Sequence, residues 1–207
     1  MTQGYKTIRS AVSAEYTEKR SRFVCFASPA PDEGAALALL GDIRAGHRDA
    51  NHNCYAYALR APNIQRYSDD GEPTGTAGMP ILEVLRHRGI VDALVVVTRY
   101  FGGIHLGAGG LVRAYSTGAA LALDTAEVLD MRPCTVFSLA LPYQNYGKLQ
   151  HLLGAFGAQV LEDDFSDLVR LRLRILSERF PAFQKDLAEL TAGGAAPVVL
   201  GEEFAAI

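Results

Sequence analysis

Strand-like and helix-like patterns of hydrophobic residues alternate along the first 130 residues of the chain. Residues 22–27 are aromatic and β-branched, and residues 52–60 alternate between two faces, so each segment predicts a β-strand. Between them, apolar residues recur three and four positions apart after Asp32, which predicts a helix. We expect Asp32 to cap the start of this helix and Gly46 to follow its end in the left-handed conformation that favours glycine.

The middle of the chain predicts a helix, a buried strand and a second helix. Pro80 and Gly89 are placed as a proline at the start of a helix and a glycine just past its end. Residues 93–97 form a continuous apolar run, which is typical of a central strand covered on both faces. Residues 111–129 are almost all small or apolar, so we expect a buried helix in which Gly118 packs closely against a neighbour.

The last third of the chain predicts a separate domain. Residues 130–133, which end in a proline, interrupt the pattern and mark the expected boundary. The expected strands cover residues 136–143, 158–165, 168–176 and 196–204, and the expected helices have apolar stripes over residues 146–156 and 180–190. The order βαββαβ is that of a ferredoxin-like domain. We predict an α+β fold, with an α/β-sandwich domain over residues 1–132 and a ferredoxin-like domain over residues 133–207.

The composition of the 207 residues is that of an ordinary globular protein, with 49% hydrophobic and 21% charged residues. A net charge of -3 argues against strong non-specific binding to nucleic acid, although a local basic patch remains compatible with it. The three cysteines are Cys25, Cys54 and Cys134, and their spacing fits neither a disulfide framework nor a metal site. We interpret them as buried free thiols of a cytoplasmic protein, since no apolar run suggests a membrane helix or a secretory signal.

Residues 68–116 contain the densest group of chemically suggestive residues. Five of the 20 glycines lie between Phe101 and Gly110, directly after the predicted central strand and before a predicted helix. Such a cluster indicates unusual backbone dihedral angles or a close approach of the backbone to another group. The first N–H groups of a helix lack partners within the helix and attract anions, so the sequence suggests an anion site at this point.

Two motifs in this stretch resemble the signature of the Impact/YigZ family. They are the run DDGEPTGTAGMPILEVL, which begins at Asp69, and the run VVVTRYFGGIHLGAGGLVRAYS, which begins at Val95. The resemblance extends over essentially the whole chain. It implies that the N-terminal domain is similar to the second domain of a small-subunit ribosomal protein, a fold shared with domain IV of elongation factor G and with GHMP-type kinases. The C-terminal domain, as in bacterial members, resembles domain V of that factor.

The resemblance also implies a link to the control of translation. Eukaryotic members of the family regulate a stress-activated kinase of translation initiation by competing for its activating scaffold, a pathway that bacteria lack. The favoured hypothesis is therefore a non-catalytic regulator or binding protein whose partner is the ribosome, RNA or a translation-related protein. The alternative is an enzyme that acts on a phosphorylated small molecule or nucleotide. Neither a cofactor nor a metal is expected.

The glycine-rich loop has two interpretations of equal weight. In the first, the N–H groups of Gly107, Gly109 and Gly110 bind a phosphate, with Arg113 one turn into the helix. A cation in the first turn opposes the helix dipole, so Arg113 makes best sense beside an anion. In the second, the loop only packs tightly and Arg113 pairs with Asp69, Asp70 or Glu72. The spacing is not that of a Walker motif.

The acidic turn before the predicted helix is also ambiguous. Asp69, Asp70 and Glu72 are oxygen donors of the kind that Mg²⁺ prefers, but Asp-Asp-Gly before a proline is more often a solvated turn, which we favour. Thr74 and Thr76 add hydroxyl groups that suit either a phosphate or a helix cap. We expect this turn and the glycine-rich loop to form one site.

His105 lies within the glycine-rich loop, but no nucleophile motif accompanies it, and we interpret it as non-catalytic. Arg99, Tyr100 and Phe101 follow the central strand, at the end where open α/β sheets bind ligands. Exposed rings there would stack on bases, whereas buried rings would only complete the core. The predicted ligand-binding set is Asp69, Asp70, Glu72, Thr74, Thr76, Arg99, Tyr100, Gly102, Gly103, His105, Gly107, Gly109, Gly110 and Arg113.

A stripe of three arginines in the C-terminal domain has two interpretations as well. Arg170, Arg172 and Arg174 project from one face of a predicted strand and would suit RNA. Residues 162–164 are acidic, however, and belong to the strand before the turn, so they are placed to pair with the arginines. We favour a charge-matched, solvated face.

Overall fold

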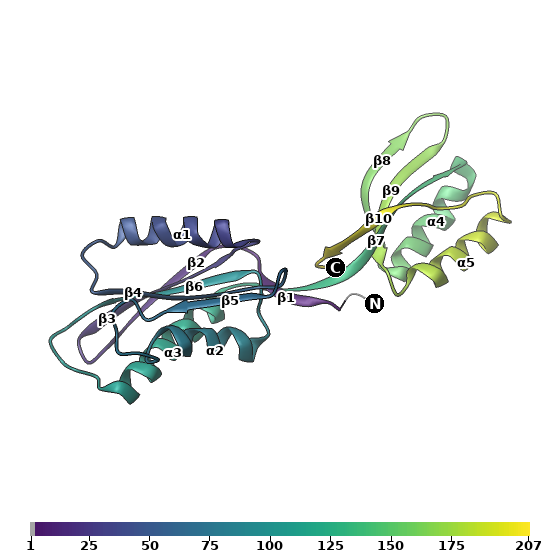
Figure 1. The fold of residues 1–207 in the computed structure, drawn as a ribbon. Helices are drawn as coiled ribbons and strands as arrows, with labels where there is room; N and C mark the ends of the chain where they lie inside the picture. Colours follow the sequence, from purple (N-terminus) through teal and green to yellow (C-terminus); the bar gives the residue numbers. More distant parts are fainter. Residues whose placement is uncertain (1–2) are drawn as a thin grey trace. The chain divides into compact units, whose positions relative to one another are not determined.

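The computed structural model describes residues 3–207, and these form a mixed α and β structure with two antiparallel sheets. The chain divides into two compact units (Figure 1). The N-terminal domain is Tyr5–Leu129, and the C-terminal domain is Asp130–Ile207 together with Gln3 and Gly4 near the start of the chain. No helix within residues 3–207 is long and apolar enough to span a membrane.

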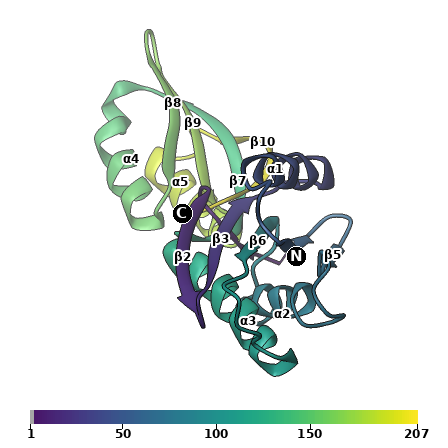
Figure 2. The ribbon, with the colours of Figure 1, turned by 90° about the vertical axis from the view of Figure 1, so that its left-hand side faces the viewer.

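The N-terminal domain is built on an antiparallel sheet with the strand order β2–β3–β6–β4–β5 (Figures 1 and 2). Its strands are β2 (Val12–Glu18), β3 (Ser21–Pro29), β4 (His52–Leu59), β5 (Ile64–Ser68) and β6 (Ala93–Tyr100). A further strand, β1 (Tyr5–Ile8), is bridged to Ile90 through Lys6. The sequence anticipated β3, β4 and β6 but not β5, a short strand of mixed polarity.

Helices cover both faces of this sheet. The helix α1 (Glu33–Gly46) lies on one face, and α2 (Gly78–Arg88) and α3 (Ala108–Thr125) lie on the other (Figure 1). The central strand β6 is therefore buried along its whole length except at Tyr100, which explains its unbroken apolar sequence. The main core consists of side chains from β3, β6, α2 and α3, and a smaller cluster lies beneath α1.

Several local predictions for this domain are confirmed. The Asp32 carboxylate accepts a hydrogen bond from the Ala35 N–H at 2.8 Å and so caps α1. Gly89 ends α2 with a φ of 65°, a left-handed conformation that glycine adopts without steric cost. At Gly118, a Cβ atom would lie 2.9 Å from the Cys25 sulfur, so only glycine allows α3 to pack this closely on β3.

Other boundaries differ from the predictions. Gly46 is the last residue of α1 rather than the residue after it, and His47 forms the cap. The helix α3 ends at Thr125 rather than Leu129, because Ala126 adopts an extended backbone with ψ of 143°. Val128 and Leu129 already belong to the next strand, β7 (Val128–Leu141). Their apolar side chains continued the apparent helical pattern, since periodicity alone cannot separate short apolar segments.

The C-terminal domain contains β7, α4 (Tyr143–Phe156), β8 (Gln159–Phe165), β9 (Val169–Leu176), α5 (Phe180–Thr191) and β10 (Val198–Ala205). The strands β10, β7, β9 and β8 lie side by side in that order, and each pairs antiparallel with its neighbour. The apolar stripes of α4 and α5 pack on one face of this sheet around Phe137 and Phe183. The order of elements along the chain is the βαββαβ order expected from the sequence.

The segment expected to be a linker is part of a strand. Asp130–Pro133 lie within β7, where Pro133 is opposite Phe204 of β10 and its carbonyl accepts a hydrogen bond from the Ser177 N–H at 3.0 Å. The ladder between β7 and β9 begins only at Cys134. Pro133 therefore removes no N–H from that ladder, and the proline did not mark a break in the strand.

Because each domain has its own core, we expect the substitution Phe137→Ala to destabilise the C-terminal domain selectively. Phe137 is fully buried, and its ring centroid lies 5.0 Å from that of Phe180 and 5.3 Å from that of Phe183. Loss of this ring should lower the free energy of unfolding of this domain by about 3–5 kcal/mol. Hydrogen exchange should then accelerate in β7 and β9 but not in β3 and β6. Equal acceleration in both domains would show that they unfold as one unit. The exposed Phe165 offers a matched control, Phe165→Ala.

Candidate functional site

Asp69 organises the acidic turn through hydrogen bonds to the backbone. One of its carboxylate oxygens accepts the N–H of Gly75 at 2.8 Å, and the other accepts those of Ala77 and Gly78 at 3.0 and 2.8 Å. Ala77 and Gly78 form the start of α2, so the carboxylate also occupies the positive end of that helix. Thr76 donates its hydroxyl to the carbonyl of Pro73. These contacts favour the structural turn over the Mg²⁺ site.

Asp70 joins the acidic turn to the start of β4. Its carboxylate pairs with Arg44 at 2.8 Å and accepts the N–H of Asn53 at 2.6 Å. Its carbonyl oxygen lies 2.9 Å from Nδ1 of His52. Since a carbonyl only accepts hydrogen bonds, Nδ1 of His52 carries a proton. The other ring nitrogen, Nε2, lies 3.8 Å from Oε1 of Glu72.

Glu72 and Arg99 form a buried ion pair at the end of the central strand. The Glu72 Oε1 atom accepts a hydrogen bond from Arg99 at 2.7 Å and another from the Tyr115 hydroxyl at 2.7 Å. The side chains of Glu72 and Arg99 are only 4% and 6% exposed. Burial raises the pKa of Tyr115 well above its ordinary value, so its hydroxyl remains a donor to Glu72.

The guanidinium of Arg99 is incompletely satisfied. It also donates to the Ser21 hydroxyl at 3.2 Å, but its buried Nε atom has no hydrogen-bond partner within residues 3–207. Its central carbon lies 5.7 Å from the centre of the Phe23 ring and 5.4 Å from that of Phe101. A buried donor without an acceptor is costly, which is why such an atom calls for an explanation.

Arg99 lines a cavity of about 400 Å³ between the acidic turn, the end of β6 and the start of α3. The lining residues are Asn51, His52, Glu72, Pro73, Arg99, Phe101, His105, Leu106, Gly107, Ala108 and Leu111. Four of them, namely Glu72, Arg99, His105 and Gly107, belong to the predicted ligand-binding set. The acidic turn and the glycine-rich loop thus contribute to one cavity. Most residues of the predicted ligand-binding set, however, do not line it.

Sequence inspection missed the residues at the start of β4. Asn51 accepts the Phe101 N–H at 2.7 Å through its side-chain carbonyl and so holds the chain where it leaves β6. His52 is opposite Arg99 in the pairing of β4 with β6. A histidine at the start of a strand carries no functional signal of its own, and only the strand pairing brings it to this cavity.

The N-terminus of α3 opens onto the same cavity without a capping side chain. Gly107 precedes the helix with a φ of 72°, and the first turn contains no acidic residue. Gly107 and Ala108 line the cavity. Glycine suits position 107, directly before the helix, because the φ of this residue lies in the left-handed region. Within residues 3–207, no side chain caps the start of α3, as the anion interpretation requires.

Arg113, in contrast, does not belong to this cavity. It lines a separate hollow of about 330 Å³, together with Tyr16, Glu18 and Lys19. Nor does it pair with Asp69, Asp70 or Glu72, whose described partners are backbone N–H groups, Arg44 and Arg99. The structure therefore places Arg113 beside neither these carboxylates nor the cavity, and the arginine that lines the cavity is Arg99.

The remaining glycines of the loop have separate roles. A Cβ atom on Gly102 would lie 2.0 Å from the carbonyl oxygen of Arg20, so the loop is packed directly on the turn between β2 and β3. Gly103 has a φ of 85°, which favours glycine. Gly110 packs on Leu106, where a Cβ atom would lie 3.0 Å away. Tight packing therefore explains some glycines of the cluster, and the conformation at the start of α3 explains Gly107.

Tyr100 and Phe101 are not the core plug that was one alternative. The Tyr100 hydroxyl lies 2.7 Å from Nδ1 of His47, and Arg22 lies over its ring. Phe101 is 41% exposed, and its ring centroid lies 5.2 Å from that of His105. The rule for parallel sheets that drew attention to these residues does not apply, because β6 pairs antiparallel with both of its neighbours.

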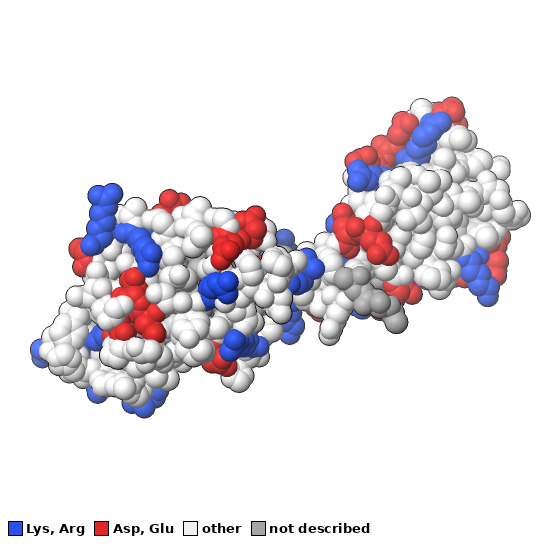
Figure 3. All heavy atoms as spheres, viewed as in Figure 1, with Lys and Arg blue, Asp and Glu red and all other residues white. Residues whose placement is uncertain are grey.

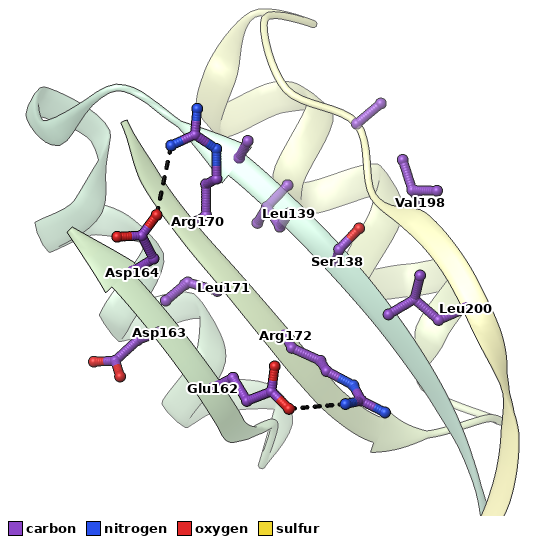
Figure 4. A pocket seen from close by; sticks show the side chains of 12 residues that line it. Ser138, Leu139, Glu162, Asp163, Asp164, Arg170, Leu171, Arg172, Val198 and Leu200 are labelled. Carbon is purple, nitrogen blue, oxygen red and sulfur yellow. Dashed lines mark hydrogen bonds and ion pairs between the residues drawn. The ribbon is translucent and has the colours of Figure 1, made fainter. Parts of the chain in front are cut away.

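The arginine stripe of the C-terminal domain is charge-matched. Arg172 pairs with Glu162 at 2.8 Å, and Arg170 lies 3.6 Å from Asp164 (Figure 4). Arg174 pairs with Glu203 at 2.8 Å. Blue and red side chains accordingly lie next to one another on this domain (Figure 3). The solvated, paired face is therefore the better interpretation, and no surplus of positive charge marks it for RNA.

Comparisons with known proteins identify the family. Residues 19–123 match the Impact N-terminal domain, and residues 139–193 match a domain of unknown function, DUF1949. The chain belongs to the Impact family. An Impact family member from Bacillus subtilis, YvyE, is 37% identical over 194 residues, which cover 93% of this chain and 89% of that protein. Impact family member YigZ from Escherichia coli is 36% identical, over 84% of this chain and 87% of that protein.

Eukaryotic Impact proteins match a smaller part of the chain. Protein IMPACT from Rattus norvegicus is 30% identical over 101 residues, which are 47% of this chain and 32% of that protein. A crystal structure described as that of a hypothetical protein is similar over 97% of this chain and 99% of its own, with a TM-score of 0.62 and 32% identity. The similarity to the bacterial Impact family members therefore includes both domains.

We expect the Arg99–Glu72 pair to be strongly coupled. Arg99→Met would leave the Glu72 carboxylate buried without a cation and should cost about 3–5 kcal/mol in the free energy of unfolding of the N-terminal domain. The double variant Arg99→Met/Glu72→Leu should recover much of this loss, because neither charge then remains buried. Urea unfolding monitored by tyrosine fluorescence provides the measurement. If the two substitutions cost independent, additive amounts, the pair is not the coupled unit that the geometry indicates.

Asp69→Asn should also destabilise this domain, since an amide cannot accept three backbone N–H groups as a carboxylate does. We expect a loss of about 1–3 kcal/mol. Asp42→Asn, at an exposed position of α1, is the matched control and should have little effect. Similar losses from both substitutions would argue against a special role for Asp69 in the turn.

Proposed function

We propose that this Impact family protein is a non-catalytic, RNA-binding regulator linked to translation, and that the cavity beside α3 accepts a phosphate group of its ligand. One observation carries the proposal. The buried guanidinium of Arg99 lines a cavity at the uncapped start of α3, and its Nε atom has no partner within the described chain. A phosphate in this cavity would place negative oxygens beside the guanidinium of Arg99 and at the first N–H groups of the helix.

Glu72 does not prevent an anion from binding at this site. Its Oε1 atom is engaged by Arg99 and by Tyr115, so its charge is balanced by the guanidinium beside it. The histidines His52 and His105 line the same cavity and add further polar groups. Because the charges of Glu72 and Arg99 balance, the positive potential of the site comes from the N-terminus of α3.

A non-catalytic role is proposed because the candidate catalytic groups have structural partners. The Asp69 carboxylate binds three backbone N–H groups, and Glu72 is held in its ion pair. Burial raises the pKa of the Cys54 thiol far above its usual range, which makes this cysteine a poor nucleophile. Turnover of a phosphorylated small molecule would favour the enzyme alternative instead.

The link to translation rests on membership in the Impact family, whose eukaryotic members the sequence resemblance ties to that process. RNA is the proposed ligand because an exposed aromatic ring, Phe101, lies at the mouth of a phosphate-accepting cavity. Aromatic rings that stack on unpaired bases, next to groups that hold the backbone, are characteristic of single-strand binding. We place this function in the cytoplasm, where buried, unpaired cysteines stay reduced.

The experiment is fluorescence polarisation with a labelled single-stranded RNA of about ten nucleotides. We expect binding that weakens as the salt concentration rises, because phosphate contacts release counterions. Phe101→Ala should weaken binding roughly 5- to 150-fold, the equivalent of about 1–3 kcal/mol for one stacked base. Phe165→Ala, which removes a similarly exposed ring from the C-terminal domain, should not. Absence of binding, or equal effects of the two variants, would refute the RNA proposal.

A further inference from the structure

We infer that the cavity beside α3 accepts a terminal phosphate monoester, the phosphorylated end of an RNA strand or a nucleoside monophosphate, rather than an internal phosphodiester. This inference rests on the proposed phosphate site and specifies its ligand. The relevant features are the depth of Arg99, the size of the cavity, the donors that converge on it and the rings at its mouth.

The burial of Arg99 and the size of the cavity favour a terminal phosphate over an internal one. Arg99 is 5% exposed and is partly covered by the ring of Phe101, whose centroid lies 5.4 Å from the guanidinium carbon. An internal phosphodiester carries a sugar on both sides and so needs an open groove through which the strand passes. A monoester has one substituent only and can enter a recess end-on. The volume of about 400 Å³ lies within the range of sites for small molecules.

The donors match the higher charge of a monoester. Near pH 7 a phosphate monoester carries about −1.5 to −2 charges and three terminal oxygens, whereas a diester carries one charge. The cavity is lined by Arg99, whose Nε atom has no partner within residues 3–207, by Gly107 and Ala108 at the first N–H groups of α3, and by His105. One negative oxygen would satisfy the buried guanidinium while the others face the helix end.

The rings at the mouth suit the nucleoside that follows the phosphate. Phe101 is 41% exposed, and its ring lies 5.2 Å from that of His105. Both side chains line the cavity that holds Arg99, so a nucleotide whose phosphate lies at α3 has an aromatic surface next to its base. The site therefore combines a phosphate end and a stacking end within one small volume.

The decisive comparison uses three RNA strands of one sequence, ending in a 5′-phosphate, a 3′-phosphate or hydroxyl groups only. We expect at least one phosphorylated strand to bind tenfold or more tightly than the hydroxyl strand. A nucleoside monophosphate should displace it, and the matching nucleoside should not. Equal affinity for all three strands would overturn the monoester inference while leaving RNA binding intact. Binding of the monophosphate without any RNA binding would keep the monoester site and refute the RNA proposal.

The substitution Ala108→Asp locates the site. Ala108 is exposed in the first turn of α3, where a carboxylate is favourable to the helix but occupies the space and charge of the phosphate. We expect it to abolish the preference for a phosphorylated end while the melting temperature stays unchanged or rises. Gln144→Asp places the same charge in the uncapped first turn of α4 and should keep the preference. If Ala108→Asp retains the preference, the phosphate binds elsewhere and the inference is wrong.

Discussion

The buried ion pair of Glu72 and Arg99 is the interaction on which the N-terminal domain depends at the end that carries the candidate site. Arg99 belongs to the central strand and Glu72 to the acidic turn, and Tyr115 of α3 donates to the same carboxylate oxygen. A charge this deeply buried is tolerated only with a partner of opposite charge. Strand, turn and helix are therefore held in one arrangement, and the cavity between them is a consequence of that arrangement.

The glycine-rich loop follows from the same constraint. Arg99 is the last buried residue of β6, and beyond Tyr100 the chain passes over the turn between β2 and β3, where only glycine fits at position 102 against the carbonyl of Arg20. The loop then returns to begin α3 at Gly107, whose left-handed φ turns the helix start toward Arg99. The cluster of glycines thus combines a packing requirement at one end with an exposed helix end at the other.

The parts of the fold that were predictable are those with local causes. The predicted caps at Asp32 and Gly89 are confirmed because a helix cap depends on a few neighbouring residues. The predicted strand β6 is confirmed because burial on both faces requires an unbroken apolar run. The end of α3 was misplaced because Val128 and Leu129 extend the apolar pattern of the helix into a strand. Most residues that line the candidate cavity lie within the two family motifs, but which arginine lies at the cavity depends on burial. Arg113 was placed with the phosphate because its position along a helix is visible in the sequence, whereas the burial and strand pairing that bring Arg99 to the cavity are not.

The hydrogen bonds of Asp69 have a consequence for how any ligand would bind. The carboxylate already binds the backbone of Gly75, Ala77 and Gly78, and Asn51 already holds the backbone of Phe101. The acidic turn, which contributes Glu72 and Pro73 to the cavity, and the chain at Phe101 are therefore held by contacts within the protein, and the entropy of ordering them is lost during folding. A ligand that enters such a preorganised recess loses mainly its own freedom of motion, so that even a small group can be bound selectively.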